Sequence, residues 1–366
     1  MKVALIIDTW FPTVGGGQTN AWEISKRLAG NGISIDIITR NTGPDSFNLP
    51  KNLNVIKLGA KIKSSDYISK ITFLSRSYFF IAGGNYDLVH AHAFLPGITA
   101  RLISVTKSIP AVFTVHGTSI DTDLNNLPKA WLEKFILTQI LYSAQITVSR
   151  DFLRIKNINK NIAYISNGVE IENFDRVKAK KAGNPTLLFV GRLHPQKNLP
   201  NLFRAINIVK KDIPNIKLII VGDGEQKESL KKIAKDLGLT SNISFKGETQ
   251  GQELIRFYKS SSAFILPSIY EGQPLTLLEA WAAKLPVIVT ATGDLPYLVR
   301  DGYNGYLIKN HKDAQGIASQ IKKALSSKNL EDLGQNGYNL VTRDFSWEKS
   351  AQKTLEVYES LTKAQN

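Results

Sequence analysis

Cysteine is absent from this 366-residue sequence. Its absence excludes disulfide bonds, thiolate metal sites and a cysteine nucleophile. Long apolar runs are also lacking: the opening run, Val3–Ile7, is followed at once by Asp8, and no stretch reaches the roughly 20 apolar residues that span a bilayer. We therefore expect no secretory signal and no membrane-spanning helix, and we expect a cytoplasmic location.

Two nucleotide-binding signatures are missing as well. The glycine loop Gly15–Gly17 follows the first predicted strand, and Val221-Gly-Asp-Gly-Glu225 follows a later one, but each lacks the third glycine of the GxGxxG pattern. There is no GxxxxGKS/T phosphate loop. Neither glycine loop is thus a dinucleotide fingerprint, although backbone amides near Gly16 could approach a phosphate or an acceptor.

Acidic residues are outnumbered by basic ones, which gives a net charge of +15. The excess is spread evenly, with 18 basic and 11 acidic residues up to position 170 and 28 and 20 after it. Such charge attracts anions, including nucleotides, nucleic acid or an anionic lipid surface. Because the chain shows no known nucleic-acid module with interleaved basic and aromatic patches, we expect no nucleic-acid partner.

Apolar strands alternate with amphipathic helices along the chain. Lys2–Asp8, a helix that ends near Gly30, and Ile33–Thr39 form a β–α–β unit, which predicts a parallel sheet. The alternation continues to about Asn167 and begins again at Thr186. The expected class is α/β, with two Rossmann-like domains that face each other across an interdomain cleft, each built on a doubly wound parallel sheet.

A change of composition marks the boundary between the two series. Residues 171–184 are polar and basic and end in turn residues, which predicts a linker. The first domain then covers residues 1–170 and the second residues 185–346. A last amphipathic helix is expected from about residue 347.

Two predicted strand ends carry side chains that suit an anionic, hydroxyl-rich ligand. Arg192 and Lys197 follow one strand, and both can hold phosphate oxygens. Glu271 precedes a helix that begins near Pro274, and Glu279 lies within that helix. Carboxylates accept hydrogen bonds from sugar or ribose hydroxyls, and the free N–H groups of a helix start favour an anion. The alternatives are surface cations, a helix-start carboxylate and an exposed helix face.

Four of the five histidines fall at or just after predicted strand ends: His90, His92, His116 and His194. His116 could hydrogen-bond a sugar hydroxyl, hold a water, or simply be satisfied within a turn. His90 and His92 share a strand face, but no third zinc ligand is evident. Asp121-Thr-Asp123 looks like a DxD metal element, yet it follows a His-Gly turn rather than a strand. We therefore expect no metal site.

The most specific sequence motifs lie between residues 187 and 305 and occur in a fixed order. They are Phe189-Val-Gly-Arg-Leu, Lys197-Asn198, Val221-Gly-Asp-Gly-Glu225, Glu271-Gly-Gln-Pro-Leu-Thr-Leu-Leu-Glu279-Ala, Pro286-Val-Ile-Val-Thr, Gly293 and Asp301-Gly-Tyr-Asn-Gly305. The first half adds Gly15-Gly16, Asp87-Leu-Val-His-Ala-His92, Thr114-Val-His-Gly117 and Ser166-Asn-Gly-Val169. With these motifs the chain resembles, over nearly its whole length, the retaining GT-B glycosyltransferases of the family-4 type, the glycosyl transferases group 1.

The resemblance implies a hexosyltransferase that moves a sugar from a nucleotide-diphosphate sugar, UDP- or GDP-linked, to a glycan or lipid-linked acceptor. It implies retention of anomeric configuration, no metal and no cofactor beyond the donor itself, and a role in cell-surface polysaccharide biosynthesis. Residues 1–170 plus about 347–366 become the acceptor-side domain, because the last helix crosses back onto it. Residues 185–346 become the donor-binding domain.

The resemblance also implies a role for each matching residue. Arg192 and Lys197 hold the donor diphosphate, Glu279 contacts the ribose, and Glu271 contacts the transferred sugar. The amides around Leu275 and Thr276 meet the phosphates. In the first domain, His116 lies beside the sugar and Gly16 allows close approach.

Two positions depart from the family pattern. Gln273 stands where family members often carry Phe, and Tyr297 follows Pro296 where they often carry Glu. We therefore expect the sugar contacts of this donor pocket to differ locally, while the class of enzyme stays the same.

Segment 51–81 combines six basic residues and one acidic residue with many apolar and aromatic ones. One interpretation is peripheral docking on the anionic inner surface of the membrane, near a lipid-linked acceptor. The other is a partly buried helix beside the acceptor cleft. Two other functions also remain open: a sugar-nucleotide epimerase of similar two-lobe fold, and a non-enzymatic binder of anionic ligands.

Overall fold

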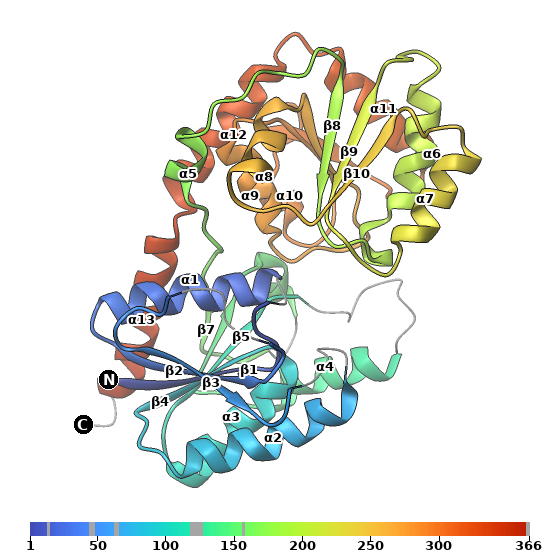
Figure 1. Ribbon diagram of the computed structural model, residues 1–366. Coiled ribbons are helices and arrows are strands. Elements are labelled where there is room, and N and C mark those ends of the chain that lie inside the picture. The colour runs from blue at the N-terminus through green and yellow to red at the C-terminus, as the bar shows by residue number, and fades with distance from the viewer. Residues whose placement is uncertain (13–14, 44–47, 62–65, 118–126, 156–157, 364–366) are drawn as a thin grey trace. The chain divides into compact units, whose positions relative to one another are not determined.

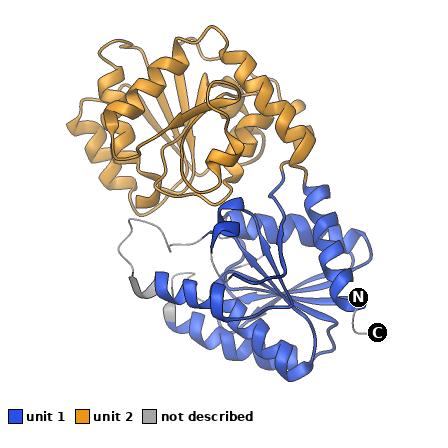
Figure 2. Cartoon of the chain, turned by 180° about the vertical axis from the view of Figure 1, so that it is seen from behind, with its two compact units in different colours: residues 1–121, 125–168, 347–366 blue, residues 122–124, 169–346 orange. Residues whose placement is uncertain are grey.

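The computed structural model of this chain describes residues 1–12, 15–43, 48–61, 66–117, 127–155 and 158–363. The Asp121–Asp123 element lies outside these residues, and so does Val14 before the glycine loop. The described chain divides into two compact units (Figure 2). Unit 1 takes in the described parts of residues 1–168 and 347–363, and unit 2 is formed by residues 169–346.

Unit 1 is built on a seven-stranded sheet whose strands are all parallel. The strand order is β3-β2-β1-β4-β5-β6-β7. The strands are β1 (Lys2–Ile7), β2 (Ser34–Arg40), β3 (Leu53–Leu58), β4 (Leu88–His92), β5 (Ala111–Val115), β6 (Ala144–Thr147) and β7 (Ile162–Tyr164).

Helices cover both faces of this sheet (Figure 1). Alternate strand residues such as Val89, Ala91 and Phe113 pack with apolar residues of α2 (Tyr67–Ala82), α3 (Phe94–Lys107) and α4 (Leu127–Gln139). The opposite face is covered by α1 (Gly16–Gly30) and α13 (Trp347–Lys363), which pack on each other. A short 3₁₀ turn, η1 (Arg150–Arg154), follows β6.

Unit 2 repeats the design with six parallel strands in the order β10-β9-β8-β11-β12-β13. The strands are β8 (Thr186–Val190), β9 (Lys217–Val221), β10 (Ile243–Gly247), β11 (Ala263–Leu266), β12 (Val287–Thr290) and β13 (Gly305–Ile308). Around them lie α5 (Ile171–Asp175), η2 (Pro195–Lys197), α6 (Leu199–Val209), α7 (Lys227–Asp236), α8 (Gly251–Ser260), α9 (Leu275–Ala282), α10 (Leu295–Leu298), α11 (Ala314–Leu325) and α12 (Leu330–Asp344). The predicted α/β class with two doubly wound parallel sheets is confirmed.

Strand order places a topological switch point in each sheet, where the direction of winding reverses. In unit 1 it lies between β1 and β4, and in unit 2 between β8 and β11. Ligands of open α/β sheets bind outside the carboxyl ends of the strands at such a point, because the loops that follow the two strands diverge there. The loops after β8 and β11 carry Arg192, Lys197 and Glu271.

Two local features differ from the sequence-based expectation. Residues 171–184 form part of unit 2: they begin with helix α5, and Phe174 and Val177 are buried in the core of that unit. Strand β3 is not predicted from the sequence, because it is an edge strand with polar Asn54 and Lys57 in place of a continuous apolar run. In the described part of the chain, no helix is long and apolar enough to cross a membrane.

Candidate functional site

The loop after β8 is shaped by side chains that hydrogen-bond to backbone groups. Nδ1 of His194 accepts from the amide of Gln196 and caps η2. Asn198 then adopts a left-handed conformation, with φ at 57°, and Nδ2 of its side chain donates to the backbone carbonyls of Pro267 and His311. Asparagine tolerates this conformation better than most residues. The loop after β8 is thereby fixed to the loop after β11.

The fixed loops bring together two of the predicted site residues, Lys197 and Glu271. Nζ of Lys197 lies 2.5 Å from Oε1 of Glu271, which also accepts a hydrogen bond from Oγ of Ser268 at 2.6 Å. The Glu271 side chain is 8% exposed and that of Lys197 19%. A carboxylate buried to this degree needs such partners. Among the described residues, none donates to Oε2 of Glu271, which stays available to a ligand.

Gly293 sets the position of the Glu271 backbone. Its φ is +54°, and a Cβ added there would stand 1.6 Å from the carbonyl oxygen of Glu271. Only glycine permits both the conformation and this approach. Gly222 stands in the same relation to the neighbouring loop, since a Cβ on it would meet the Gly191 carbonyl oxygen at 2.1 Å. The sequence motifs at these glycines therefore mark backbone packing around the site.

Arg192 lies in the same loop as Lys197, but its side chain is exposed. Its backbone carbonyl accepts a hydrogen bond from the amide of His194, but within the described residues its guanidinium forms no hydrogen bond or ion pair. A guanidinium in this state can still turn toward an anion, and it offers five N–H donors in a planar fork.

Helix α9 carries the remaining predicted residues of unit 2. Leu275 and Thr276 form its first turn, so their backbone N–H groups have no acceptor within the helix and can donate to a ligand. Glu279 lies one turn further on, and its Oε2 accepts a hydrogen bond from the hydroxyl of Tyr258 at 2.7 Å. Burial raises the pKa of Glu279, and the bond from Tyr258 opposes that rise because it favours the charged carboxylate.

The unit 1 residues lie at the carboxyl ends of the other sheet. The glycine loop leads directly into α1, whose first residue is Gly16. A Cβ added at Gly17 would stand 3.4 Å from the ring of His116, which follows β5. A Cβ added at Gly16 would meet no described atom within 4 Å. Space is therefore open beside Gly16, while Gly17 packs against the His116 imidazole.

His116 belongs to a cluster of three imidazoles. Its Nε2 lies 2.9 Å from Nδ1 of His92, and the ring of His92 lies 4.5 Å from that of His90 between centroids. Both nitrogens of His90 meet hydroxyls, Nδ1 that of Tyr358 at 2.6 Å and Nε2 that of Thr114 at 2.7 Å. Burial lowers the pKa of His116 to about 4 and that of His90 to about 3, and it places the pKa of His92 well below its usual value. All three rings are thus neutral near pH 7.

The prediction that His90 and His92 lie on one face of the strand is therefore confirmed. Their partners on that face are His116 and the hydroxyls of Thr114 and Tyr358. In the described residues no group of three His, Asp or Glu side chains is placed to hold a metal ion. The sequence predicts no role for the hydroxyls of Tyr258 and Ser268, because no local pattern links them to Glu279 and Glu271.

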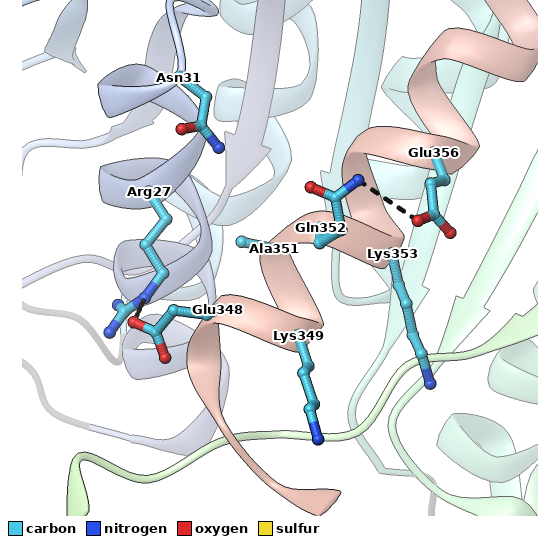
Figure 3. A pocket seen from close by; sticks show the side chains of 8 residues that line it. All are labelled: Arg27, Asn31, Glu348, Lys349, Ala351, Gln352, Lys353 and Glu356. Carbon is cyan, nitrogen blue, oxygen red and sulfur yellow. Dashed lines mark hydrogen bonds and ion pairs between the residues drawn. The ribbon is translucent and has the colours of Figure 1, made fainter.

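A hollow of about 540 Å³ lies between α1 and α13 (Figure 3). Arg27 and Glu348 form an ion pair at its side, with Nε of Arg27 2.7 Å from Oε1 of Glu348. The other lining side chains are also mostly polar, and none of the predicted site residues is among them. The hollow lies toward the end of α1 opposite Gly16, so it is separate from the carboxyl edge of the sheet.

Two family models match the chain, one after the other. The model described as Glycosyltransferase Family 4 matches residues 14–173, and that described as Glycosyl transferases group 1 matches residues 170–340. The chain is 30% identical to an uncharacterised glycosyltransferase of Methanocaldococcus jannaschii, with 99% of each covered. It is 26% identical to the UDP-Gal:alpha-D-GlcNAc-diphosphoundecaprenol alpha-1,3-galactosyltransferase of Escherichia coli, with 98% of the chain and 97% of the relative covered.

Solved structures share the fold over the full length. Sucrose-phosphate synthase from Thermosynechococcus elongatus matches with a TM-score of 0.86 at 22% identity, with 99% of each chain covered. HepE of Anabaena, in complex with UDP and glucose, matches with a TM-score of 0.80 at 17% identity, with 99% of this chain and 100% of that chain covered. At these identities the match establishes the two-domain GT-B fold.

Proposed function

This chain belongs to glycosyltransferase family 4, the glycosyl transferases group 1, and we propose that it transfers a hexose from a UDP-sugar to a lipid-linked acceptor in polysaccharide biosynthesis. The UDP donor and the lipid-linked acceptor are supported by the Escherichia coli relative, whose name specifies a UDP-sugar and a diphosphoundecaprenol acceptor. A neighbour of the same fold was solved with UDP and glucose. Family membership implies retention of configuration.

The contact between Lys197 and Glu271 at the β8/β11 switch point carries the proposal. Breaking the donor's glycosidic bond leaves an oxocarbenium-like sugar and an anionic diphosphate. The ammonium of Lys197 has three donors and uses one on Glu271, so two remain for phosphate oxygens. Oε2 of Glu271 would accept from hydroxyls of the transferred sugar. One side-chain pair would thus contact both products of bond cleavage.

Arg192 and the start of α9 complete the anion site. The exposed Arg192 guanidinium would close on the diphosphate, and the amides of Leu275 and Thr276 would donate to it. Fixed positive groups stabilise the charge that develops on the leaving group, and the loss of one such contact costs about 10²–10³-fold in rate. Glu279, held by Tyr258, would accept from the ribose hydroxyls through its other oxygen, Oε1.

In unit 1, we assign His116 to the transferred sugar and Gly16 to close backbone approach. The half-buried His116 has one ring nitrogen on His92, which leaves Nδ1 for a sugar hydroxyl. The open space beside Gly16 supports its role, because a side chain there would occupy volume that a ligand can use.

Glu271→Ala tests the function. We expect transfer from UDP-hexose to a diphospholipid acceptor to fall by about 10²–10³-fold or more while the melting temperature of the protein with UDP still rises. Glu228→Ala, which removes an exposed carboxylate paired with Lys231, is the control and keeps full activity. Full activity in Glu271→Ala would contradict the site assignment.

The same assay separates the alternatives, and a thermal-shift screen of UDP-, GDP- and ADP-sugars tests the donor base. An epimerase converts the sugar nucleotide with no acceptor present, and a non-enzymatic binder shifts the melting temperature without product. We expect UDP to be released only when an acceptor is present. A stabilising GDP-sugar in place of the UDP-sugars would contradict the UDP assignment.

Contact with an anionic membrane surface is supported by one face of unit 1. The outward sides of α2, α3 and α4 expose large apolar residues, among them Ile68 at 75%, Phe79 at 73% and Trp131 at 68%. Helices α2 and α3 contain no acidic residue, and the one acidic residue of α4, Glu133, is buried. The inward side of α2 is core, since Phe73 is 1% exposed. Helix α2 thus has a buried side and an exposed apolar side, and the exposed side supports the docking proposal.

Flotation with vesicles tests this docking. We expect the protein to float with anionic vesicles at low salt and less so at high salt, because salt screens the basic residues of the face. A triple Ile68→Ser, Phe79→Ser, Trp131→Ser variant should stay at the bottom of the gradient. Tyr303→Ser, at an exposed aromatic residue of unit 2, is the control. Absence of binding by the unchanged protein to anionic vesicles at low salt would contradict the docking.

A further inference from the structure

The proposed function gives His116 a role but leaves its buried neighbour, His92, without one. His92 is 1% exposed and ends β4, directly opposite Thr114 of β5 in the parallel pairing. Residues two apart on a strand share a face, so the side chain of His116, which follows β5, lies on the same side of the sheet. Nδ1 of His92 and Nε2 of His116 are 2.9 Å apart, and the two rings are inclined by only 26°. Because the ring centroids are 5.1 Å apart, the two nitrogens lie between the rings, and the contact is a hydrogen bond.

Both imidazoles are neutral, so a single proton lies between Nδ1 of His92 and Nε2 of His116. One of these two nitrogens carries it and is the hydrogen-bond donor. If Nε2 of His116 were the donor, Nε2 of His92 would carry a proton inside the unit, and no described residue accepts it there. If Nδ1 of His92 is the donor, Nε2 of His92 is instead an unpaired acceptor. A buried N–H without a partner is rarer than an under-satisfied acceptor. The second arrangement is favoured.

We propose that His92 is a positioning residue, which donates from Nδ1 to Nε2 of His116 and thereby fixes His116 in the Nδ1–H tautomer. His116 then presents an N–H donor, and not a lone pair, to an oxygen of the bound sugar. The hydrogen bond made by one ring nitrogen sets the protonation of the other. This inference rests on the proposed function for the sugar contact, but the tautomer itself can be measured without any substrate.

The surroundings hold the two rings in place. The first turn of α1 packs on one side of the His116 ring at Gly17. The ring of His90 lies beside that of His92, and His90 is fixed by Thr114 and by Tyr358 of α13. Neither of these two hydroxyls bonds to His92 or His116 among the described contacts. The hydroxyl of Tyr358 can thus be removed without breaking the bond between His92 and His116.

Long-range ¹H–¹⁵N spectra of histidine-labelled protein test the proposal directly, because they distinguish the two tautomers. We expect the unchanged protein to show His116 protonated at Nδ1. An asparagine amide can occupy the place of Nδ1 of a histidine, whereas a glutamine amide reaches that of Nε2. His92→Asn should therefore keep the His116 tautomer, and His92→Gln and His92→Phe should lose it.

The rates of sugar transfer should follow the order of the variants in keeping the His116 tautomer. Transfer by His92→Gln and His92→Phe should fall by about 10-fold to 100-fold in kcat with little change in the donor KM, because the donor is still bound but the sugar contact is misplaced. His92→Asn should recover most of that loss. Tyr358→Phe is the matched control, and it should change neither the tautomer nor kcat.

Three results would overturn the proposal: an unchanged protein with His116 protonated at Nε2, a His92→Phe variant with unchanged tautomer and kcat, or equal effects of Asn and Gln at position 92. His116→Ala separates this failure from that of the proposed function. If His116→Ala transfers sugar at the full rate, the sugar contact is wrong, and the spectra still decide whether His92 sets the tautomer.

Discussion

The hydroxyl of Tyr258, at the end of α8, donates to Oε2 of Glu279 in α9 at 2.7 Å. Tyr258 is fully buried, so the bond forms away from water. It fixes one oxygen of the carboxylate and leaves the other for a ligand. It also offsets part of the effect of burial on the pKa of Glu279.

Tyr258→Phe removes that hydroxyl and keeps the ring. We expect the pKa of Glu279 to rise further, and the affinity for UDP to fall by about 1 kcal/mol, or roughly fivefold in Kd, because the carboxylate is less well oriented. Calorimetric titration with UDP measures the change. Tyr338→Phe, whose hydroxyl contacts exposed Asp175, is the control and should bind UDP normally. Equal Kd values for Tyr258→Phe and the unchanged protein would refute the assignment of Glu279.

Lys197→Met leaves Glu271 buried without its cation. The free energy of unfolding should fall by about 3 kcal/mol, since a buried charge without a partner is costly. In the double variant with Glu271→Gln the loss should be smaller than the sum of the single losses, with a coupling of about 1 kcal/mol or more. Urea denaturation of the four proteins measures it. The exposed pair Lys231–Glu228 serves as the control cycle, with a coupling below about 1 kcal/mol. Additive losses at Lys197 and Glu271 would contradict a stabilising pair.

Gly293→Ala forces a side chain against the carbonyl of Glu271. We expect it to lower both stability and UDP affinity, because the loop that carries Glu271 has to move. Gly251→Ala is a matched control: its φ is +62°, close to that of Gly293, but no atom lies within 4 Å of the added Cβ. The backbone conformation alone costs the control about 1–2 kcal/mol. A similar loss in both variants would show that the collision is harmless.

The free energy of unfolding should fall as the pH drops below about 6.5. The pKa of His90 is lowered to about 3 in the folded protein, against an ordinary value of 6.5. Between these values the unfolded chain binds a proton that the native state does not. Stability is therefore fully present above pH 6.5 and is lost toward acid, at about 1.4 kcal/mol per pH unit for one proton.

His90→Gln isolates this contribution. The free energy of unfolding of this variant, measured in urea between about pH 5 and pH 7, should depend less steeply on pH than that of the unchanged protein. The reason is that about one proton fewer is taken up on unfolding. The carboxylates contribute to both proteins and cancel in the difference. The pKa of His92 is lowered by burial and, to a smaller extent, by His90, so the contribution of His92 changes only by that smaller part. Parallel curves for the two proteins would mean that His90 binds its proton equally in both states.

The class of the fold could be predicted because its signals are local. A buried strand such as Lys2–Ile7 and the helix after it differ in the period of their apolar residues, and that period is visible within a few residues of sequence. The order of the motifs was sufficient to identify the family. The edge strand β3 lacked such a signal, because only one of its six residues is buried.

The membership of the candidate site was predicted residue by residue, and its internal contacts were not. Lys197 and Glu271 are 74 positions apart, and Tyr258 and Glu279 are 21 apart. They meet because of the order of strands and helices, which depends on the packing of the whole unit. The ligand-binding roles of all these residues stay predictions, those of Lys197, Glu271, Glu279 and His116 as much as those of Arg192, Leu275, Thr276 and Gly16.

The sequence by itself determined the α/β class, the family and the chemistry available, since residue types and their periods are written along the chain. The tertiary structure alone decided which charges neutralise each other, which hydroxyl holds Glu279 and which nitrogen of His92 meets His116. These contacts join segments that only strand order brings together, so no local pattern encodes them.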